Sequence, residues 1–286
     1  MAIVHVDTKL VGLLGNPLGH SFSPAMQNNA FEIRGLNYFY LPIEVTPNDL
    51  ADVVRGISKM NFAGYNVTIP HKIRIMALLD HVDELAKNIG AVNVVTQKNG
   101  ISTGYNTDGE GFIRSLEAET GISVPGRRFF IIGCGGAARA IAITLAFRGA
   151  ERIFICNRTE QKARNLVAAI NAGVRPCGEA VRVDSSEIQA GIGQAEVLIN
   201  TTSIGMHPDE DRLPIAAELI PEGLIVSDIV YNPVKTKLLQ VAEKRGCKIV
   251  NGLGMLVYQG AEAFKLWTGK EPPVEAMFRV VRSLKN

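Results

Sequence analysis

A glycine-rich turn between a strand-like run and a helix-like run constrains this chain more than any other feature. Residues 129–132 read FFII, the turn reads Gly133-x-Gly135-x-x-Ala138, and residues 137–148 follow with a helical apolar pattern. In a dinucleotide-binding unit, the first glycine permits a tight turn and the second lets the backbone approach a pyrophosphate. The third small residue allows close packing of helix and strand. The helix amino terminus then offers unpaired N–H groups to the phosphates. This order of strand, turn and helix predicts a dinucleotide-binding site rather than a purely structural turn.

The residues after the next predicted strand indicate which dinucleotide binds. NAD-binding units place a carboxylate there, which accepts hydrogen bonds from the ribose 2′-hydroxyl. This chain has Asn157-Arg158-Thr159 instead, directly after an apolar run at residues 152–156. A guanidinium pairs with a 2′-phosphate through charge-assisted bonds, whereas a carboxylate would repel it. We therefore expect NADP rather than NAD. The alternative is that Asn157 and Thr159 only cap the helix that follows.

Short apolar runs alternate with helical patterns along most of the chain, which is typical of an α/β fold with mainly parallel sheets covered by helices. The Pro125-Gly126 turn separates a first stretch of this pattern from a second. In the first stretch, the predicted strands are residues 10–14, 38–44, 64–69 and 91–97, and the predicted helices are residues 24–34, 47–58 and 71–79. In the second, the predicted strands are residues 129–132, 152–156, 197–200, 225–229 and 248–250, and the predicted helices are residues 137–148, 160–171 and 235–245.

The end of the chain is predicted to be wholly helical. Residues 257–267 and 274–284 have helical patterns, and the second sheet has no further strand with which they could alternate. We expect these helices to pack back on the first domain. The expected organisation is a discontinuous substrate-binding and catalytic domain, residues 1–107 and 253–286, and a Rossmann-type NADP-binding domain, residues 108–252.

Charge and composition argue against several other classes of protein. The formal net charge is only +2 and no apolar run approaches the length of a membrane span, so we expect neither a nucleic-acid nor a membrane partner. The five histidines are scattered and the four cysteines lack paired spacing, which predicts reduced thiols and no metal site. The amino terminus lacks the pattern of a signal peptide, so we expect a cytoplasmic protein. The oligomeric state stays open, with a homodimer as one alternative.

Lys72 is the first candidate for acid–base chemistry. It follows Pro70 at the end of the run GYNVTIPHK, and proline suits the first position of a helix. A lysine in the first helical turn faces the positive end of the helix dipole, which favours loss of its proton and suits a general acid–base. The alternative is a solvated surface lysine. The neighbouring Asn66 and Thr68 favour the chemical role.

Three further polar residues are candidates for substrate contacts. Asp108, in the run GYNTDG, could orient such a lysine and a substrate hydroxyl, or it could be an ordinary helix cap, as could Thr107. Ser21 and Ser23 lie two residues apart, so an extended backbone would point both hydroxyls the same way. Two hydroxyls beside a helix amino terminus would hold a small carboxylate, unless they only cap the helix.

Several short runs stand in a distinctive order along the chain. They are GNPLGHSFSP, GYNVTIPHK, GAVN, GYNTDG, GCGGAARA, NRT, YNP and GLGMLVYQGAEAF. In these runs and their order, the chain resembles the shikimate dehydrogenase family, including its quinate/shikimate relatives, over essentially its whole length. The resemblance implies an enzyme that holds a ring carboxylic acid between two domains.

The resemblance also implies which residues bind the substrate. Ser21 and Ser23 would hold its carboxylate, with Tyr231 near them. The residues implied around the ring hydroxyls are Asn66, Thr68, Lys72, Asn93, Asp108 and Gln259. Of these, Lys72 and Asp108 are the implied catalytic pair.

On the cofactor side, the resemblance implies a row of contacts along NADP. The residues implied at the turn and pyrophosphate are Gly133, Gly135, Gly136 and Ala137, and those at the adenosine phosphate are Asn157, Arg158 and Thr159. Thr201 and Thr202 would line the groove, while Ile229 and Gly252 would meet the nicotinamide. Lys162 either adds a second charge at the phosphate or is a solvated helix residue. In the branch that accepts NAD, an acidic residue follows the arginine, whereas this chain has Thr159 there.

The expected reaction is the NADPH-dependent, reversible reduction of 3-dehydroshikimate to shikimate, a step in the biosynthesis of chorismate and the aromatic amino acids. Lys72, held by Asp108, would supply the proton to the carbonyl oxygen. One alternative is an enzyme that acts mainly on quinate, which shares the carboxylate and the hydroxyl array. The other is a non-catalytic sensor of NADP, which would have no need of a lysine–aspartate pair.

Overall fold

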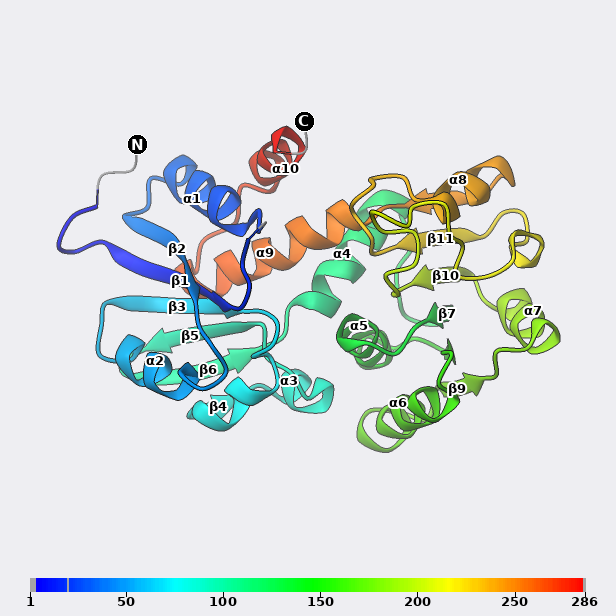
Figure 1. Ribbon diagram of the computed structural model, residues 1–286, viewed down its shortest axis with the longest axis horizontal. Coiled ribbons are helices and arrows are strands. Elements are labelled where there is room, and N and C mark those ends of the chain that lie inside the picture. The colour runs from blue at the N-terminus through cyan, green and yellow to red at the C-terminus, as the bar shows by residue number, and fades with distance from the viewer. Residues whose placement is uncertain (1–3, 20, 285–286) are drawn as a thin grey trace. The chain divides into compact units, whose positions relative to one another are not determined.

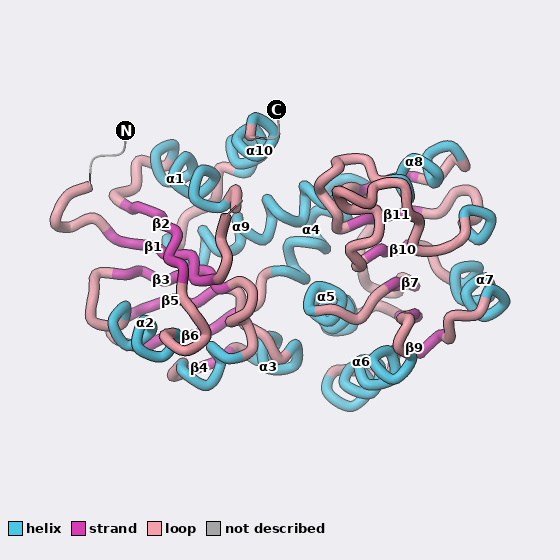
Figure 2. The backbone as a smooth tube through the Cα atoms, in the orientation of Figure 1, coloured by secondary structure: helices cyan, strands magenta, loops and turns pink. Residues whose placement is uncertain are grey.

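The fold is described from a computed structural model for residues 4–19 and 21–284. The chain divides into two compact units (Figure 1). The first comprises the described residues up to Thr107 together with those from Val257 onward, and the second comprises Asp108–Leu256. Each unit has its own six-stranded sheet with helices on both faces, as Figure 2 shows. The prediction of an α/β fold is confirmed.

The first unit is built on a sheet with the strand order β2-β1-β3-β5-β6-β4. Its strands are β1 (Lys9–Gly15), β2 (Tyr38–Glu44), β3 (Phe62–Val67), β4 (His81–Val82), β5 (Val94–Lys98) and β6 (Ile101–Tyr105). β1 runs parallel to β2 and β3, and β4 runs parallel to β6, whereas β5 is antiparallel to both of its neighbours. The predicted strand at residues 91–97 is therefore one arm of a hairpin. The hairpin turns at Asn99-Gly100, whose positive φ angles of 53° and 78° suit a two-residue hairpin turn.

Helices cover both faces of this first sheet. On one face lie α2 (Leu50–Ile57), the 3-10 helix η1 (Arg74–Leu78) and α3 (Glu84–Ile89). On the other lie α1 (Ser23–Ile33), α9 (Gly252–Thr268) and α10 (Val274–Ser283). Phe31 of α1 stacks on Phe264 of α9 with ring centroids 5.3 Å apart, and Trp267 Nε1 donates to the Val95 carbonyl at 3.0 Å. The prediction that the C-terminal helices pack back on the first domain is confirmed.

The helix predicted at residues 71–79 is wrong. Residues 70–73 form turns, and only the short 3-10 helix η1 follows them. The backbone N–H of His71 closes a turn onto the Thr68 carbonyl at 2.9 Å, and its buried ring Nε2 bonds to the Val45 carbonyl at 2.7 Å. The segment thus begins with a tight turn and continues as a 3-10 helix, which is wound more tightly than an α-helix. Lys72 is therefore not in the first turn of an α-helix, and the helix-dipole argument for its chemistry does not apply.

The second unit has a wholly parallel sheet with the strand order β12-β11-β10-β7-β8-β9. Its strands are β7 (Arg128–Ile132), β8 (Arg152–Cys156), β9 (Gly178–Val181), β10 (Val197–Asn200), β11 (Ile225–Asp228) and β12 (Lys248–Val250). Its helices are α4 (Asp108–Thr120), α5 (Gly136–Phe147), α6 (Glu160–Gly173), α7 (Ser185–Gln194) and α8 (Lys237–Lys244), with the short 3-10 helix η2 (Ala217–Leu219). The strand order reverses between β7 and β10. In open α/β sheets, ligands bind beyond the carboxyl ends of the strands at this switch point.

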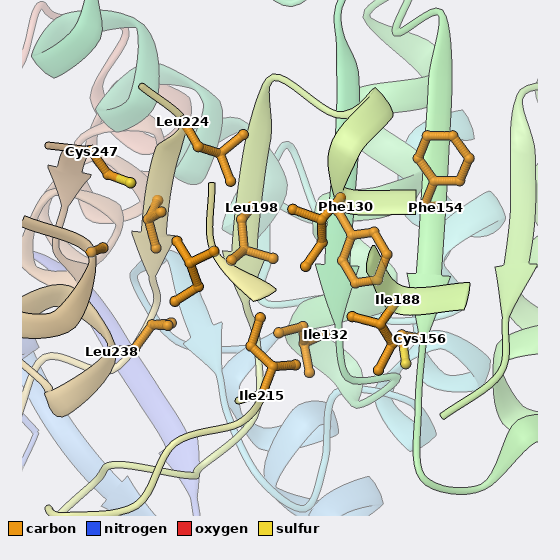
Figure 3. Close-up of a cluster of buried hydrophobic side chains, with 14 of the residues drawn as sticks. Phe130, Ile132, Phe154, Cys156, Ile188, Leu198, Ile215, Leu224, Leu238 and Cys247 are labelled. Atoms are coloured by element: carbon orange, nitrogen blue, oxygen red, sulfur yellow. The ribbon is translucent and has the colours of Figure 1, made fainter. Parts of the chain in front are cut away.

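Side chains that alternate along the strands of the second unit fill a core against α7 and α8. Figure 3 shows this cluster, and the residues labelled in it are Phe130, Ile132, Phe154, Cys156, Ile188, Leu198, Ile215, Leu224, Leu238 and Cys247. The strands must be apolar on both faces, because α4, α5 and α6 cover the opposite face of the sheet. Such packing holds the carboxyl ends of β7, β8, β10 and β11 at one edge.

Candidate functional site

Gly133 is the point at which the glycine turn leaves β7. Its φ of +109° lies in the region that favours glycine, and a Cβ built on it would stand 2.6 Å from Thr201 Oγ1. That hydroxyl in turn donates to the Ile132 carbonyl at 2.6 Å. Both the conformation and the close approach of Thr201 therefore require glycine here. The structure brings the turn after β7 and the predicted groove residue after β10 into direct contact.

Gly135 and Gly136 face open space in front of α5. A Cβ built on either residue would meet nothing within 4 Å, and both residues are exposed. Gly135 is the N-cap of α5 and the side chain of Ala138 is fully buried, so the first N–H groups of the helix lie directly behind this space. The turn therefore fits a pyrophosphate, which such N–H groups and the helix dipole stabilise.

The residues after β8 form a positively charged edge. Arg158, Thr159 and Lys162 are exposed, and neither cation makes an ion pair with a described carboxylate, while Glu160 is paired with Arg164. Thr159 occupies the N-cap position of α6, but its side chain makes no capping bond, whereas Asn157 Nδ2 donates to the Thr159 carbonyl at 2.9 Å. The capping alternative thus leaves the arginine, the lysine and the threonine hydroxyl unexplained. A 2′-phosphate fits this edge better than a bare ribose.

The carboxyl ends of β10 and β11 carry the other predicted cofactor residues. Thr202 donates from its N–H and its hydroxyl to Asn200 Oδ1, at 3.1 and 2.7 Å. Gly252 lies directly on the backbone of Ile229, because a Cβ built on it would stand 2.2 Å from the Ile229 carbonyl oxygen. Tyr231, two residues further on, is 39% exposed. The structure thus places Ile229 and Gly252 together at the end of β11.

In the first unit, a row of hydrogen bonds joins three of the predicted substrate residues. Tyr40 Oη donates to Asn66 Oδ1 at 2.7 Å, and Asn66 Nδ2 donates to the Asn93 carbonyl at 3.0 Å. Asn93 Nδ2 donates to Thr107 Oγ1 at 3.0 Å, while the Thr107 N–H donates to Asn93 Oδ1 at 2.8 Å. Thr107 Oγ1 also donates to the Gln259 carbonyl at 3.0 Å. Asn66, Asn93 and Gln259 are thereby fixed in one array.

Tyr40 is a member of this row that the sequence did not single out. Burial of the ring raises the pKa of the phenol far above its ordinary value, and the nearby side chain of Ser23 opposes that rise. Tyr40 stands in a strand-like run, so periodicity alone assigns it to the core. No local signal distinguishes a core tyrosine from one whose hydroxyl bonds to a predicted substrate residue.

The remaining predicted residues lie on neighbouring segments. Ser23 begins α1, and its N–H donates to Ser21 Oγ at 3.3 Å. Thr68 lies against Gly15, since a Cβ on that glycine would stand 2.4 Å from Thr68 Cγ2. The half-buried Lys72 has its carbonyl bound by the Val92 N–H at 2.8 Å, next to Asn93 in the chain. Asp108 directly follows Thr107 and is the first residue of α4, in the second unit.

Other kinds of site find little support in the described part of the chain. No group of three or more histidine, cysteine, aspartate or glutamate side chains could hold a metal ion among the residues described. The four cysteines are free, and burial raises the pKa of the Cys134 thiol to about 11. Among the described residues, no helix combines the length and apolarity needed to cross a bilayer.

Comparison with known proteins assigns the family. The shikimate dehydrogenase substrate-binding domain matches residues 13–95, the shikimate/quinate 5-dehydrogenase family matches residues 116–207, and the shikimate 5′-dehydrogenase C-terminal domain matches residues 252–282. A shikimate dehydrogenase (NADP+) of Methanopyrus kandleri is 48% identical over 279 residues, which are 97% of this chain and 96% of that one. The chain belongs to the shikimate dehydrogenase family.

Solved structures of similar proteins share this fold over nearly their whole length. A shikimate 5-dehydrogenase from Listeria monocytogenes, in complex with shikimate and NAD, is 40% identical with a TM-score of 0.94, and the match covers 98% of this chain and 99% of that one. A quinate dehydrogenase from Corynebacterium glutamicum, in complex with NAD, is 31% identical with a TM-score of 0.89. The match covers 96% of this chain and 99% of that one. The family therefore includes members with different substrates and cofactors on one fold.

Proposed function

We propose that this protein catalyses the reversible, NADPH-dependent reduction of 3-dehydroshikimate to shikimate. The observation that carries the proposal is the row of hydrogen-bonded hydroxyl and amide side chains from Tyr40 through Asn66 and Asn93 to Thr107. A ring acid with several hydroxyls needs neutral donors and acceptors that are held in place before it binds. Family membership supports the same assignment, since curated relatives are named shikimate dehydrogenase (NADP+).

The proposed division of labour follows the two units. Residues 1–107 and 253–286 would form the substrate-binding and catalytic domain, and residues 108–252 the NADP-binding domain. The proposed substrate-binding residues are Ser21, Ser23, Asn66, Thr68, Asn93, Tyr231 and Gln259. The proposed cofactor-binding residues are Gly133, Gly135, Gly136, Ala137, Asn157, Arg158, Thr159, Lys162, Thr201, Thr202, Ile229 and Gly252. Arg158 and Lys162, which pair with no described carboxylate, support NADP over NAD, because the 2′-phosphate would give this guanidinium and ammonium a counter-charge.

Lys72 and Asp108 are the proposed catalytic pair. NADPH, when bound, supplies the hydride for the ring carbonyl carbon. Lys72 holds the proton that the carbonyl oxygen takes up, and in the reverse direction it receives the proton of the hydroxyl. Asp108 orients the ammonium group and accepts from a ring hydroxyl. The hydroxyls of Ser21 and Ser23 hold the carboxylate at the other end of the ring, so the carbonyl is fixed by binding groups on both sides.

Substitution of Lys72 tests the proposed chemistry. Lys72→Ala is expected to lower kcat by about 10²–10⁴-fold, the usual contribution of a positioned proton donor, and to leave the Kd for NADP unchanged. Asp108→Asn is expected to lower kcat and to raise the KM for shikimate. Lys59→Ala, which removes an exposed lysine of the same unit, is the matched control and should behave as wild type. Wild-type turnover by Lys72→Ala would refute the assignment of the proton donor.

Oxidation of quinate is the second candidate function. A quinate dehydrogenase shares the fold at 31% identity, and quinate offers the same carboxylate and several of the same hydroxyls. The shape of the substrate pocket separates the two acids. Shikimate is the proposed main substrate because the relatives of higher identity are shikimate dehydrogenases.

We also propose that the protein acts in the cytoplasm, on a small-molecule substrate and without nucleic-acid or membrane partners. Its four cysteines are free, as is usual in a reducing compartment. A homodimer is the assembly to test first, and light scattering of the purified protein measures it.

A further inference from the structure

Asp228 is a buried carboxylate that the proposed chemistry does not use. It is the last residue of β11, and its side chain is fully shielded from solvent. Burial raises the pKa of the Asp228 carboxyl above its ordinary value, although three donors oppose the rise. Burying a charged group is costly unless it is hydrogen-bonded, so a carboxylate at this place calls for an explanation.

The Asp228 carboxylate binds donors from three different segments of the second unit. Its Oδ1 accepts from Asn200 Nδ2 and from the Val230 N–H, each at 3.0 Å, and its Oδ2 accepts from Thr236 Oγ1 at 2.7 Å. Asn200 is the last residue of β10, Val230 belongs to the loop after β11, and Thr236 is the N-cap of α8. One side chain therefore connects a neighbouring strand, its own loop and the next helix.

The bonds of Asn200 extend this connection toward the glycine turn. Its Oδ1 accepts from the N–H and hydroxyl of Thr202, while its Nδ2 donates to Asp228. Thr201, which lies between Asn200 and Thr202 in the chain, packs on Gly133 and donates to the Ile132 carbonyl. The network thus runs from the turn after β7 through the end of β10 to the loop after β11, along the edge where a dinucleotide would lie.

The loop from Ile229 to Thr236 is the segment that Asp228 holds. The Ile229 N–H donates to the Asn200 carbonyl at 3.1 Å, and the Val230 N–H is bound by Asp228. Ile229 and Tyr231, on either side of Val230, are proposed contacts of the nicotinamide and the substrate. Thr236, at the far end of the loop, is fixed by the same carboxylate. Both ends of the loop therefore depend on Asp228.

We propose that Asp228 is a positioning residue, which fixes the loop carrying Ile229 and Tyr231 relative to the ends of β7 and β10. The inference rests on the proposed function for the roles of Ile229 and Tyr231. A carboxylate suits this task because it is an acceptor only and can take bonds from an amide, a backbone N–H and a hydroxyl at once. An apolar residue of similar size would leave those three donors buried and unpaired.

The first test measures the loop itself, without any ligand. Amide hydrogen exchange is compared for wild type, Asp228→Ala, Asp228→Asn and the matched control Ile192→Ala. The control opens a cavity in the core of the same unit, outside the network. We expect exchange at residues 229–232 to rise at least about tenfold in Asp228→Ala and to stay near wild type in Ile192→Ala. Unchanged exchange of this loop in Asp228→Ala would overturn the inference.

The second test measures steady-state kinetics and NADP binding of the same variants. Asp228→Ala is expected to lower kcat/KM for shikimate about 10–100-fold, since displacement of a group by about 1 Å can have such an effect. The Kd for NADP should change less than about threefold, because the adenosine end is bound after β8. Asp228→Asn keeps an oxygen for Asn200 and Val230 and should restore most of kcat/KM.

The outcomes distinguish a failure of the proposed function from a failure of the positioning role of Asp228. A wild-type protein without shikimate turnover would contradict the proposed function, while hydrogen exchange would still decide whether Asp228 holds the loop. An active wild type with Asp228→Ala at unchanged kcat and KM would overturn the positioning role. The same loss of kcat/KM in Ile192→Ala would also overturn it, because general destabilisation would then explain the effect.

Thr236→Val, which removes one donor with little change of shape, replaces Asp228→Ala if that variant does not fold, and it is expected to show a smaller loss of kcat/KM.

Discussion

Residue 133 must be glycine for two separate reasons, one of backbone conformation and one of space. Its positive φ is a matter of backbone conformation, and a side chain there would cost about 1–3 kcal/mol. The contact with Thr201 is a matter of space, because Thr201 Oγ1 is held by its bond to the Ile132 carbonyl and cannot move away freely. A side chain at residue 133 would therefore disturb both the turn and the end of β10.

Gly133→Ala is expected to lower the free energy of unfolding by about 2–4 kcal/mol, from strain and overpacking together, and to raise the Kd for NADP. Urea unfolding and titration with NADP measure the two effects. Gly193→Ala is the matched control, because Gly193 lies in α7 of the same unit and a Cβ there meets nothing within 4 Å. The control should stabilise the helix by about 0.5–1 kcal/mol. Equal stability of Gly133→Ala and wild type would contradict the role given to this residue.

Single residues differ in how far the sequence could predict them. Gly133 and Gly135 stand in a spacing that has a known physical purpose, so their place in the turn could be predicted. Lys72 could be identified as a candidate, but the reason drawn from a helix dipole is wrong, because residues 70–73 form turns and a short 3-10 helix follows them. Tyr40 and Asp228 carried no local signal, since each bonds to an asparagine that lies far away in the sequence, Asn66 and Asn200 respectively.

At the scale of elements, β2 shows how the first sheet ends. It lies at the edge of the sheet, so its outward backbone groups have no strand partner. Asn28 of α1 takes that place for Tyr40: its Oδ1 accepts from the Tyr40 N–H at 2.8 Å and its Nδ2 donates to the Tyr40 carbonyl at 2.9 Å. Pro42 further along β2 has no N–H to offer. An open strand edge favours pairing with another chain, and Asn28 blocks this edge.

Asn28→Ala is expected to lower the free energy of unfolding by about 1–3 kcal/mol, because it leaves both backbone groups of Tyr40 without their partner. It should also increase self-association, which light scattering detects. Asn48→Ala removes an exposed asparagine of the same unit and should change stability by no more than about 0.5 kcal/mol. If the urea midpoints of Asn28→Ala and wild type coincide, the edge does not depend on this side chain.

Four strands have the bounds that the sequence predicts. In β8 and β10, a continuous apolar run between polar segments marks where the strand begins and ends, and β2 and β12, at the edges of their sheets, have the predicted bounds as well. β9 and α7 were not predicted, since the run GEAV is short and partly polar. The second arm of the β5–β6 hairpin was also missed, although Asn99-Gly100 is a recognised turn signal.

At the scale of the whole molecule, the chain divides its chemistry between two units. The first holds the row of neutral polar side chains, and the second holds the glycine turn and the exposed Arg158 and Lys162 after β8. The division into two α/β units could be predicted, because strand and helix patterns alternate along the chain. The packing of the last helices on the first unit could be predicted too, because no strand follows them. Bonds between side chains from distant segments could not, since periodicity reports only which face of an element is buried.

Initial rates with four substrate and cofactor pairs measure which acid and which dinucleotide the protein prefers. The purified protein is assayed with shikimate or quinate, each with NADP or NAD, and kcat/KM is compared. We expect shikimate with NADP to be the best pair, at least about tenfold above shikimate with NAD and above quinate with NADP, because Arg158 and Lys162 would bind the 2′-phosphate. Equal or better use of NAD, a preference for quinate, or the absence of turnover with every pair would contradict the account.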